Sequence, residues 1–194
     1  MWKIDKEFHF EAGHRVWSQE LKHPDLSIST DCACKHLHGH SYVLKVELES
    51  TTLDQSGMVT DFKNLNFMKE FIDNELDHKF IIDINDPNFE LITSLSADTT
   101  REYLKLYSHS PGMVNFVNLW TLWSMNSALP YMVYNEKPNL LDHYRSFVIV
   151  EFVPTSENIC KYLGLYAEEK IKDVAKVSAV ELWETKKSHC RYTL

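Results

Sequence analysis

The amino-acid sequence predicts an α+β fold in which an antiparallel sheet carries helices on one face. Two segments near the N-terminus alternate apolar and polar residues with a period of two, which is typical of half-buried strands. Two later segments, 61–76 and 156–173, place apolar residues at helical spacing. The order strand, strand, helix and then helix, strand, with this kind of alternation, favours helices packed on one side of the sheet.

The first strand is expected over residues 3–14, where the apolar residues share one face. His14 continues their phase, so its side chain is expected to point inward. Residues 15–37 contain Pro24 and a run of polar residues, and they predict a loop. The second strand is expected over 39–50, where apolar and polar residues alternate again.

The remaining regular elements follow from caps and periodicity. Asp61 is the expected N-cap of a helix that reaches about Leu76. A β-branched run over 146–153 predicts an extended segment that ends before Pro154 and leads into the second helix. A last strand is expected at about 177–185.

Residues 91–145 form an aromatic-rich insertion in what we interpret as a single domain over 1–194. The insertion is too apolar for a flexible linker, so we expect it to form additional core or an oligomer contact, with a lid as the alternative. A helix is predicted over 97–107. The large aromatic residues of the insertion are Phe116, Trp120, Trp123, Tyr131, Tyr134 and Tyr144.

Composition excludes several classes of partner. The net charge of −8 argues against broad binding to nucleic acids or to anionic membranes. No apolar run approaches the roughly 18 residues of a membrane span, and the first residues lack the apolar core of a secretion signal. The four cysteines indicate a chemical role for thiols more than a disulfide framework. We therefore expect a cytoplasmic protein.

Three histidines predict a metal centre. His38 and His40 lie two apart at the start of the second strand, so both imidazoles point to the same face. His14 ends the first strand in the inward phase. Burying three uncompensated imidazoles would be costly, and metal coordination removes that cost. Three nitrogen ligands leave the fourth position of a tetrahedral Zn²⁺ open, which is the pattern of a catalytic site.

A thiol lies close to this cluster in the sequence. Cys34 precedes His38 by four residues, and a nearby dication would favour its thiolate as a base. Cys34 as an inert buried residue or a fourth ligand is the alternative, and Cys32 can in principle reach the site too. A structural zinc site made of both cysteines with His38 and His40 has tighter spacing than zinc fingers and leaves His14 unexplained.

Other acidic and imidazole groups are candidates for substrate chemistry. Asp77 and His78 are adjacent, and a carboxylate can fix the tautomer of an imidazole and raise its basicity, although a solvated helix end is the simpler interpretation. Glu184 continues an apolar row on the last strand, so it is a candidate acceptor for the planar N–H edge of a ligand. Glu157 lies at the expected N-terminus of a helix, and a favourable interaction with the helix dipole is the simpler interpretation of this residue.

Together these motifs resemble the 6-pyruvoyl-tetrahydropterin synthase / 6-carboxytetrahydropterin synthase family. The matching segments occur in the family's order and cover most of the chain outside 91–145. They are FHFEAGHR (8–15), CKHLHGHSY (34–42), GMVTDFKNL (57–65), LDHKFIID (76–83), PTSEN (154–158) and VELWET (180–185), followed by Cys190.

The resemblance implies a fold, a cofactor and an assembly. The fold would be the T-fold, a four-stranded antiparallel sheet with two helices packed on one face. Three copies would form a twelve-stranded barrel, and two trimers would stack as a homohexamer. Zn²⁺ would be bound by His14, His38 and His40. The substrate would be a small-molecule pterin, 7,8-dihydroneopterin triphosphate.

The resemblance also implies roles for individual residues. Cys34 would be the base. Asp77 and His78 would act as a pair contributed across a subunit interface, and Glu184 would anchor the pterin ring. The segment on the pterin side would comprise Thr155, Ser156 and Glu157.

The spacing of the cysteines separates the branches of the family. In the queuosine-pathway branch three residues separate the cysteine from His-Gly-His, as they do for Cys34, whereas the pyruvoyl branch has the spacing of Cys32. A third branch has Glu at the position of Lys35 and is disfavoured. We therefore expect a lyase that forms 6-carboxy-5,6,7,8-tetrahydropterin with loss of triphosphate and acetaldehyde. The alternatives are 6-pyruvoyl-tetrahydropterin synthase, which eliminates triphosphate, and a non-catalytic pterin-binding protein.

Overall fold

The computed structural model describes residues 1–20, 32–107, 116–118 and 138–194. The chain divides into two compact units, which we describe separately. The first unit comprises Met1–Ala12, His40–Asp77 and Thr155–Leu194. The second comprises Gly13–Gly39 and His78–Pro154.

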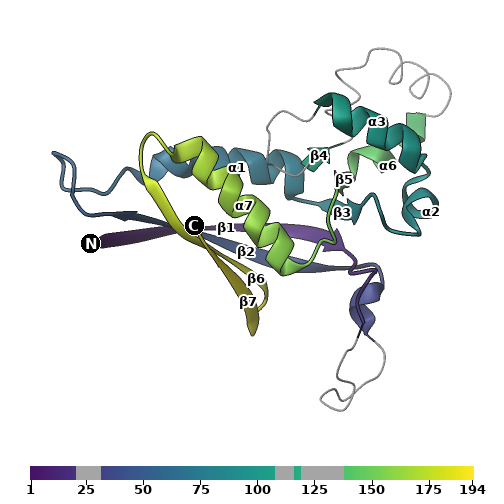
Figure 1. Ribbon diagram of the computed structural model, residues 1–194, viewed down its shortest axis with the longest axis horizontal. Coiled ribbons are helices and arrows are strands. Elements are labelled where there is room, and N and C mark those ends of the chain that lie inside the picture. The colour runs from purple at the N-terminus through teal and green to yellow at the C-terminus, as the bar shows by residue number, and fades with distance from the viewer. Residues whose placement is uncertain (21–31, 108–115, 119–137) are drawn as a thin grey trace. The chain divides into compact units, whose positions relative to one another are not determined.

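The described residues form seven strands, which pair in the order β4-β5-β3-β1-β2-β6-β7 (Figure 1). The β2/β6, β6/β7 and β4/β5 pairs are antiparallel, whereas β3 and β5 are parallel. The strands are β1 Trp2–His14, β2 His38–Ser50, β3 Lys79–Asp83, β4 Phe116–Asn118, β5 Phe147–Val150, β6 Lys176–Thr185 and β7 Ser188–Thr193.

The expected four-stranded antiparallel sheet is therefore wrong in strand number and in kind. A parallel pair needs a long crossover connection, and the insertion between β3 and β5 supplies it. The chain also turns back after Thr185 to add β7, which alternates exposed and half-buried positions. The α+β character of the prediction holds.

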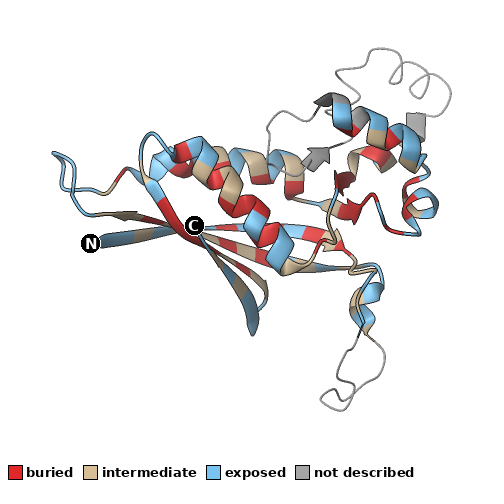
Figure 2. Cartoon of the chain, viewed as in Figure 1, coloured by how far each residue is buried: buried red, intermediate tan, exposed pale blue. Residues whose placement is uncertain are grey.

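In the first unit, the predicted alternation of β1 and β2 is confirmed. Phe8, Phe10 and Ala12 are buried, while the residues between them are exposed, and buried and more exposed positions also alternate along β2 (Figure 2). In both strands the buried residues are the apolar ones, apart from His14 at the end of β1. This pattern leaves a polar face on the other side of the two strands.

The helix expected over 61–76 forms as three consecutive helical pieces. They are the 3-10 helix η3 Phe62–Leu65, α1 Asn66–Phe71 and the π-helix η4 Ile72–Leu76. The carboxylate of Asp61 accepts a hydrogen bond from the backbone N–H of Lys63 at 2.8 Å, which confirms the expected cap. The π-helix ends where the N–H of Asp77 donates to the carbonyl of Ile72 at 2.8 Å.

The second expected helix, α7 Ser156–Ile171, packs on β6 and β7 (Figure 1). Thr155 caps its N-terminus, because the hydroxyl accepts from the N–H of Asn158 at 3.3 Å. Aromatic contacts between Phe71 and both Tyr162 and Tyr166 join α7 to α1. Both expected helices therefore belong to the first unit.

In the second unit, part of the insertion surrounds a separate apolar core. Its helices are α2 Phe89–Thr93, α3 Ala97–Tyr107 and α6 Pro138–Arg145, and α3 confirms the helix expected over 97–107. Tyr144 is buried in this core, as expected, together with Ile82, Ile84, Phe89, Leu104, Phe147 and Ile149. Trp120, Trp123, Tyr131, Tyr134 and the side chain of Phe116 lie outside the described residues. None of the helices in the described part of the chain has the length and apolarity needed to cross a membrane.

Candidate metal centre and active site

The three predicted histidines come together at the ends of two adjacent strands. His14 is the last residue of β1, and His38 and His40 are the first and third residues of β2. One candidate ligand atom of each residue lies within 4.8 Å of those of the others. His14 is only 1% exposed, and the rings of His14 and His38 lie 4.4 Å apart. The expected cluster is therefore present.

Backbone carbonyls orient two of these rings. Nδ1 of His14 lies 2.6 Å from the carbonyl oxygen of Pro154, and Nδ1 of His38 lies 2.8 Å from that of His36. Because a carbonyl can only accept, each Nδ1 carries the proton and each Nε2 keeps its lone pair for a ligand. Metal-binding histidines are typically held in this way, so the residues fit a divalent metal such as zinc.

The predicted base lies on a short 3-10 helix, η2 Ala33–Lys35, which is the element that precedes β2. Cys34 is half-buried, and its carbonyl accepts a hydrogen bond from the N–H of Val16 at 2.8 Å. Val16 follows His14 by two residues. The backbone of Cys34 is therefore joined to the segment that follows His14, a candidate metal ligand.

The other candidate thiol is engaged elsewhere. The thiol of Cys32 donates to the side-chain oxygen of Gln19 at 2.8 Å. This hydrogen bond directs the proton of the Cys32 thiol at an amide oxygen.

On β6, Glu184 extends the buried row as expected, but only in part. Leu182 is fully buried, whereas the side chain of Glu184 is 28% exposed. An oxygen of Glu184 lies 3.5 Å from Nε2 of His40. Burial, with a contribution from the charge of Glu184, raises the pKa of Tyr42, whose ring lies edge-on to His40. Glu184 is thus a partly accessible acceptor beside an imidazole and a neutral phenol.

The predicted acid–imidazole pair lies where the π-helix meets β3. The carboxylate of Asp77 accepts from the N–H of Glu11 at 2.8 Å. His78 is exposed and has a left-handed backbone with φ of 59°, an uncommon conformation for a residue with a side chain. The catalytic roles of Asp77 and His78 stay predictions.

The predicted pterin-side residues surround the start of α7. Thr155 is the cap, Glu157 is exposed, and the hydroxyl of Ser156 is buried with no hydrogen-bond partner among the described residues. The thiol of Cys190 donates to the carbonyl of Ser156 at 3.1 Å. A hydrogen bond from the Cys160 thiol lowers the pKa of Cys190, against the effects of burial and of Glu157. Contact of Thr155, Ser156 and Glu157 with the substrate stays a prediction.

Sequence reasoning missed two carboxylates that contact the segment after His14. Asp83 accepts from the indole N–H of Trp17, and Asp86 pairs with Arg15. A signal was available for Asp83, because an acid follows directly on the fully buried residues Ile81 and Ile82. The sequence contains no comparable signal for Asp86.

Comparison with known proteins gives the family. A family model described as 6-pyruvoyl tetrahydropterin synthase matches residues 3–194. The 6-carboxy-5,6,7,8-tetrahydropterin synthase of Aquifex aeolicus is 32% identical over 98% of this chain and 97% of its own length. The enzyme of that name from Haemophilus influenzae is 28% identical over 99% of both chains. A solved structure of an uncharacterized Wolinella succinogenes protein is 41% identical, with a TM-score of 0.80 over 99% of this chain and 97% of its own. The chain therefore belongs to the 6-pyruvoyl tetrahydropterin synthase family and is an enzyme of the lyase class.

Proposed function

We propose that this enzyme converts 7,8-dihydroneopterin triphosphate to 6-carboxy-5,6,7,8-tetrahydropterin in a zinc-dependent reaction that releases triphosphate and acetaldehyde. The reaction would be a step of the queuosine and deazapurine pathway. The observation that carries the proposal is the cluster of three imidazoles, two of which have Nδ1 held by a carbonyl. The names of the full-length relatives from Aquifex and Haemophilus support the choice of product.

His14, His38 and His40 would hold the metal through one ring nitrogen each. A metal held there would supply a Lewis acid, able to coordinate substrate hydroxyl groups and to stabilise negative charge on oxygen. The burial of His14 and the carbonyl contacts of His14 and His38 keep those rings from turning. The protein thus prepares the site before the substrate arrives.

Cys34 would act as the base that takes a proton from carbon in the substrate side chain. Its position on η2, tied through its carbonyl to Val16, keeps it near the strand end that carries His14. The hydrogen bond from Cys32 to Gln19 supports the choice of Cys34 over Cys32. Asp77 and His78 would then pass protons to or from the pterin ring or the leaving fragment.

Glu184 would recognise the pterin ring. A carboxylate can accept two parallel hydrogen bonds from the N–H and NH₂ groups along one edge of a planar heterocycle. The carboxylate of Glu184 is partly accessible and already lies 3.5 Å from His40. The segment at the start of α7 would contact the same ligand through Thr155, Ser156 and Glu157.

We further propose that the enzyme is a cytoplasmic homohexamer built from two trimers. This assembly is what the resemblance to the family implies. In such an assembly Asp77 and His78 would complete the site of a neighbouring copy. Light scattering on the purified protein should give six times the mass of one chain, and a monomer with full activity would contradict the shared site.

Mass analysis of the products formed from 7,8-dihydroneopterin triphosphate tests the proposed reaction. We expect 6-carboxytetrahydropterin and acetaldehyde in equal amounts, and no product after zinc is removed with a chelator. Release of triphosphate with 6-pyruvoyl-tetrahydropterin as the product would assign the enzyme to the pyruvoyl reaction. Tight pterin binding without turnover by the zinc-loaded protein would show a binding protein.

A further inference from the structure

The segment that follows His14 is held to the turn after β3 by two side-chain contacts. Nε of Arg15 lies 3.0 Å from Oδ2 of Asp86, and Nε1 of Trp17 donates to Oδ2 of Asp83 at 2.9 Å. All four residues belong to the second unit. The segment is thus connected to the turn on both sides of Val16.

The turn itself, residues 83–86, is stiffened by the other oxygens of the same carboxylates. Oδ1 of Asp83 accepts from the backbone N–H of Asn85 at 2.9 Å and from its side-chain amide at 3.0 Å. Oδ1 of Asp86 accepts from the N–H of Asn88 at 2.8 Å. Each carboxylate therefore uses one oxygen to shape the turn and the other to hold the segment after His14.

The burial of the Arg15–Asp86 pair indicates that the pair fixes the position of Arg15 more than it stabilises the fold. The side chain of Asp86 is completely buried, and that of Arg15 is 15% exposed. Removing such charges from water offsets most of their attraction, so a buried pair adds little net stability. The same burial removes competing water, and it holds Arg15 in one position.

The segment held in this way carries both the metal ligand and the contact to the proposed base. His14 directly precedes Arg15, and the N–H of Val16, between Arg15 and Trp17, donates to the carbonyl of Cys34. On the other side of His14, a Cβ added to Gly13 would lie 2.5 Å from the ring of Phe80 on β3. The side chain of Phe80 on β3 therefore approaches the backbone closely just before His14, and the β3 turn holds the segment just after it.

We propose that Asp86 and Asp83 are positioning residues of the metal centre, which fix His14 and Cys34 through Arg15 and Trp17. The inference rests on the proposed metal role of His14. The insertion contributes, because the guanidinium of Arg101 on α3 donates to the carbonyl of Ile84 and to the side chain of Asn85, both at 3.3 Å. A helix of the insertion thus supports the turn that positions the metal ligand.

Zinc affinity of the purified protein tests this role, measured by competition with a chromophoric chelator. The variant Asp86→Asn keeps the shape of the side chain but removes its charge. We expect its zinc affinity to fall roughly 10- to 100-fold, the effect typical of losing a partner that orients a metal ligand. The visible spectrum of the Co²⁺-loaded variant should shift as well, because the ligand geometry changes. The control Asp142→Asn removes a carboxylate that pairs with Arg145 at the surface of the same unit, and it should stay within about twofold of the wild type.

A folded Asp86→Asn protein with unchanged zinc affinity and an unchanged Co²⁺ spectrum would overturn the proposal, even if its thermal stability is lower. If Asp86→Asn does not fold, Trp17→Phe decides, because it removes the N–H that Asp83 accepts and keeps an aromatic ring at this position. A loss of zinc affinity in Trp17→Phe supports the role, and an unchanged affinity contradicts it. A different result, in which His14→Ala binds zinc as tightly as the wild type, would refute the metal role of His14 and with it the proposed function.

Discussion

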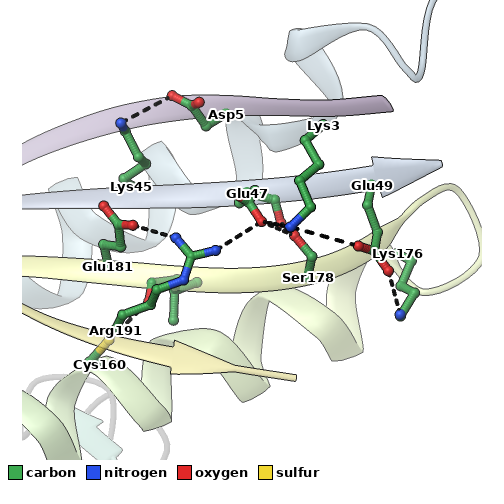
Figure 3. Close-up of polar contacts among 11 residues, drawn as sticks. Lys3, Asp5, Lys45, Glu47, Glu49, Cys160, Lys176, Ser178, Glu181 and Arg191 are labelled. Atoms are coloured by element: carbon green, nitrogen blue, oxygen red, sulfur yellow. Dashed lines mark hydrogen bonds and ion pairs between the residues drawn. The ribbon is translucent and has the colours of Figure 1, made fainter. Parts of the chain in front are cut away.

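The carboxylate of Glu47 lies within a network of charged groups on β1, β2, β6 and β7 (Figure 3). It accepts hydrogen bonds from Lys3 at 2.7 Å, from the hydroxyl of Ser178, and from Arg191 at 3.0 Å. These hydrogen bonds, that of Lys3 first, lower the pKa of Glu47 to about 2 from its ordinary value of 4.5. The ionisation of this one side chain therefore affects contacts among four strands of the first unit.

The shift predicts how stability depends on pH. Because the pKa is lower in the folded state, the ionised carboxylate stabilises the fold above about pH 4.5, and this contribution is lost as the pH falls toward about 2. The side chain is 18% exposed, so we expect Glu47→Gln to lower the free energy of unfolding by only about 1 kcal/mol at pH 7.

Urea unfolding of the wild type and Glu47→Gln between pH 7 and pH 3 measures this effect. The difference between the two proteins should shrink as the pH falls. Asp73→Asn is a suitable control, since this carboxylate pairs with the exposed Lys69 on a helix surface and should change stability little. A difference that stays constant over this pH range would contradict the account of Glu47.

The two cysteines of the η2 region make separable predictions about the reaction. Cys34→Ala should reduce turnover by at least about 100-fold, the usual contribution of a general base, while one zinc per chain stays bound. Cys32→Ala should keep most of the activity, because its thiol is engaged with Gln19. Steady-state kinetics with zinc analysis measures both variants. An inactive Cys32→Ala enzyme would favour the pyruvoyl reaction, and loss of zinc in Cys34→Ala would make Cys34 a ligand.

At the scale of elements, α7 can pack closely on β6 and β7 because Gly164 has no side chain. A Cβ at this position would lie 2.9 Å from a methyl group of Val180 and 3.0 Å from the ring of Tyr192. Both are closer than ordinary van der Waals contact. A glycine in the middle of α7 thus allows close packing of the helix that Thr155 caps and that begins with Ser156 and Glu157.

Gly164→Ala should therefore destabilise the protein. Overpacking costs about 1–3 kcal/mol, which should outweigh the roughly 1 kcal/mol that alanine gains over glycine in a helix. Thermal and urea unfolding measure the sum. Lys161→Ala, at an exposed position of α7, provides the matched control and should change stability little. A Gly164→Ala protein as stable as the wild type would show that the helix can move away from the strands without loss.

Elements with a local signal could be predicted from the sequence, and elements defined by their partners could not. The alternation in β1 and β2 and the cap at Asp61 depend on neighbours in the chain, and both are confirmed. The parallel pairing of β3 with β5 depends on the path of the long insertion, which no short pattern encodes. The left-handed backbone of His78 could not be predicted either, because this position is not a glycine.

The candidate site also combines features that a local sequence pattern predicts with features that depend on distant parts of the chain. The spacing of His38 and His40 and the inward phase of His14 predicted the cluster, because strand geometry alone brings them to one face. The carbonyl that orients His14 belongs to Pro154, 140 residues away in the chain, so only the complete fold provides it. The ion pair of Arg15 and Asp86 is equally non-local.

At the scale of the whole molecule, the family match extends over both the candidate metal centre and the insertion. The family model covers residues 3–194, which include the insertion as well as the segments that carry the three histidines. The insertion contributes Leu104 and Tyr144 to the core of the second unit and, through Arg101, a contact to the β3 turn. We therefore expect that an internal deletion within 91–145 that removes α3 lowers zinc affinity, which the same chelator competition measures. A deletion variant that folds and keeps the affinity of the wild type would separate the insertion from the metal centre.

Zinc content per chain, measured by elemental analysis on the wild type and on single variants, tests the central claim most directly. We expect one zinc per chain in the wild type and in Cys34→Ala, and close to none in His14→Ala. A wild type that binds no zinc would contradict the claim. So would zinc that stays in His14→Ala but disappears from Cys32→Ala and Cys34→Ala, because the metal would then be held by the two cysteines.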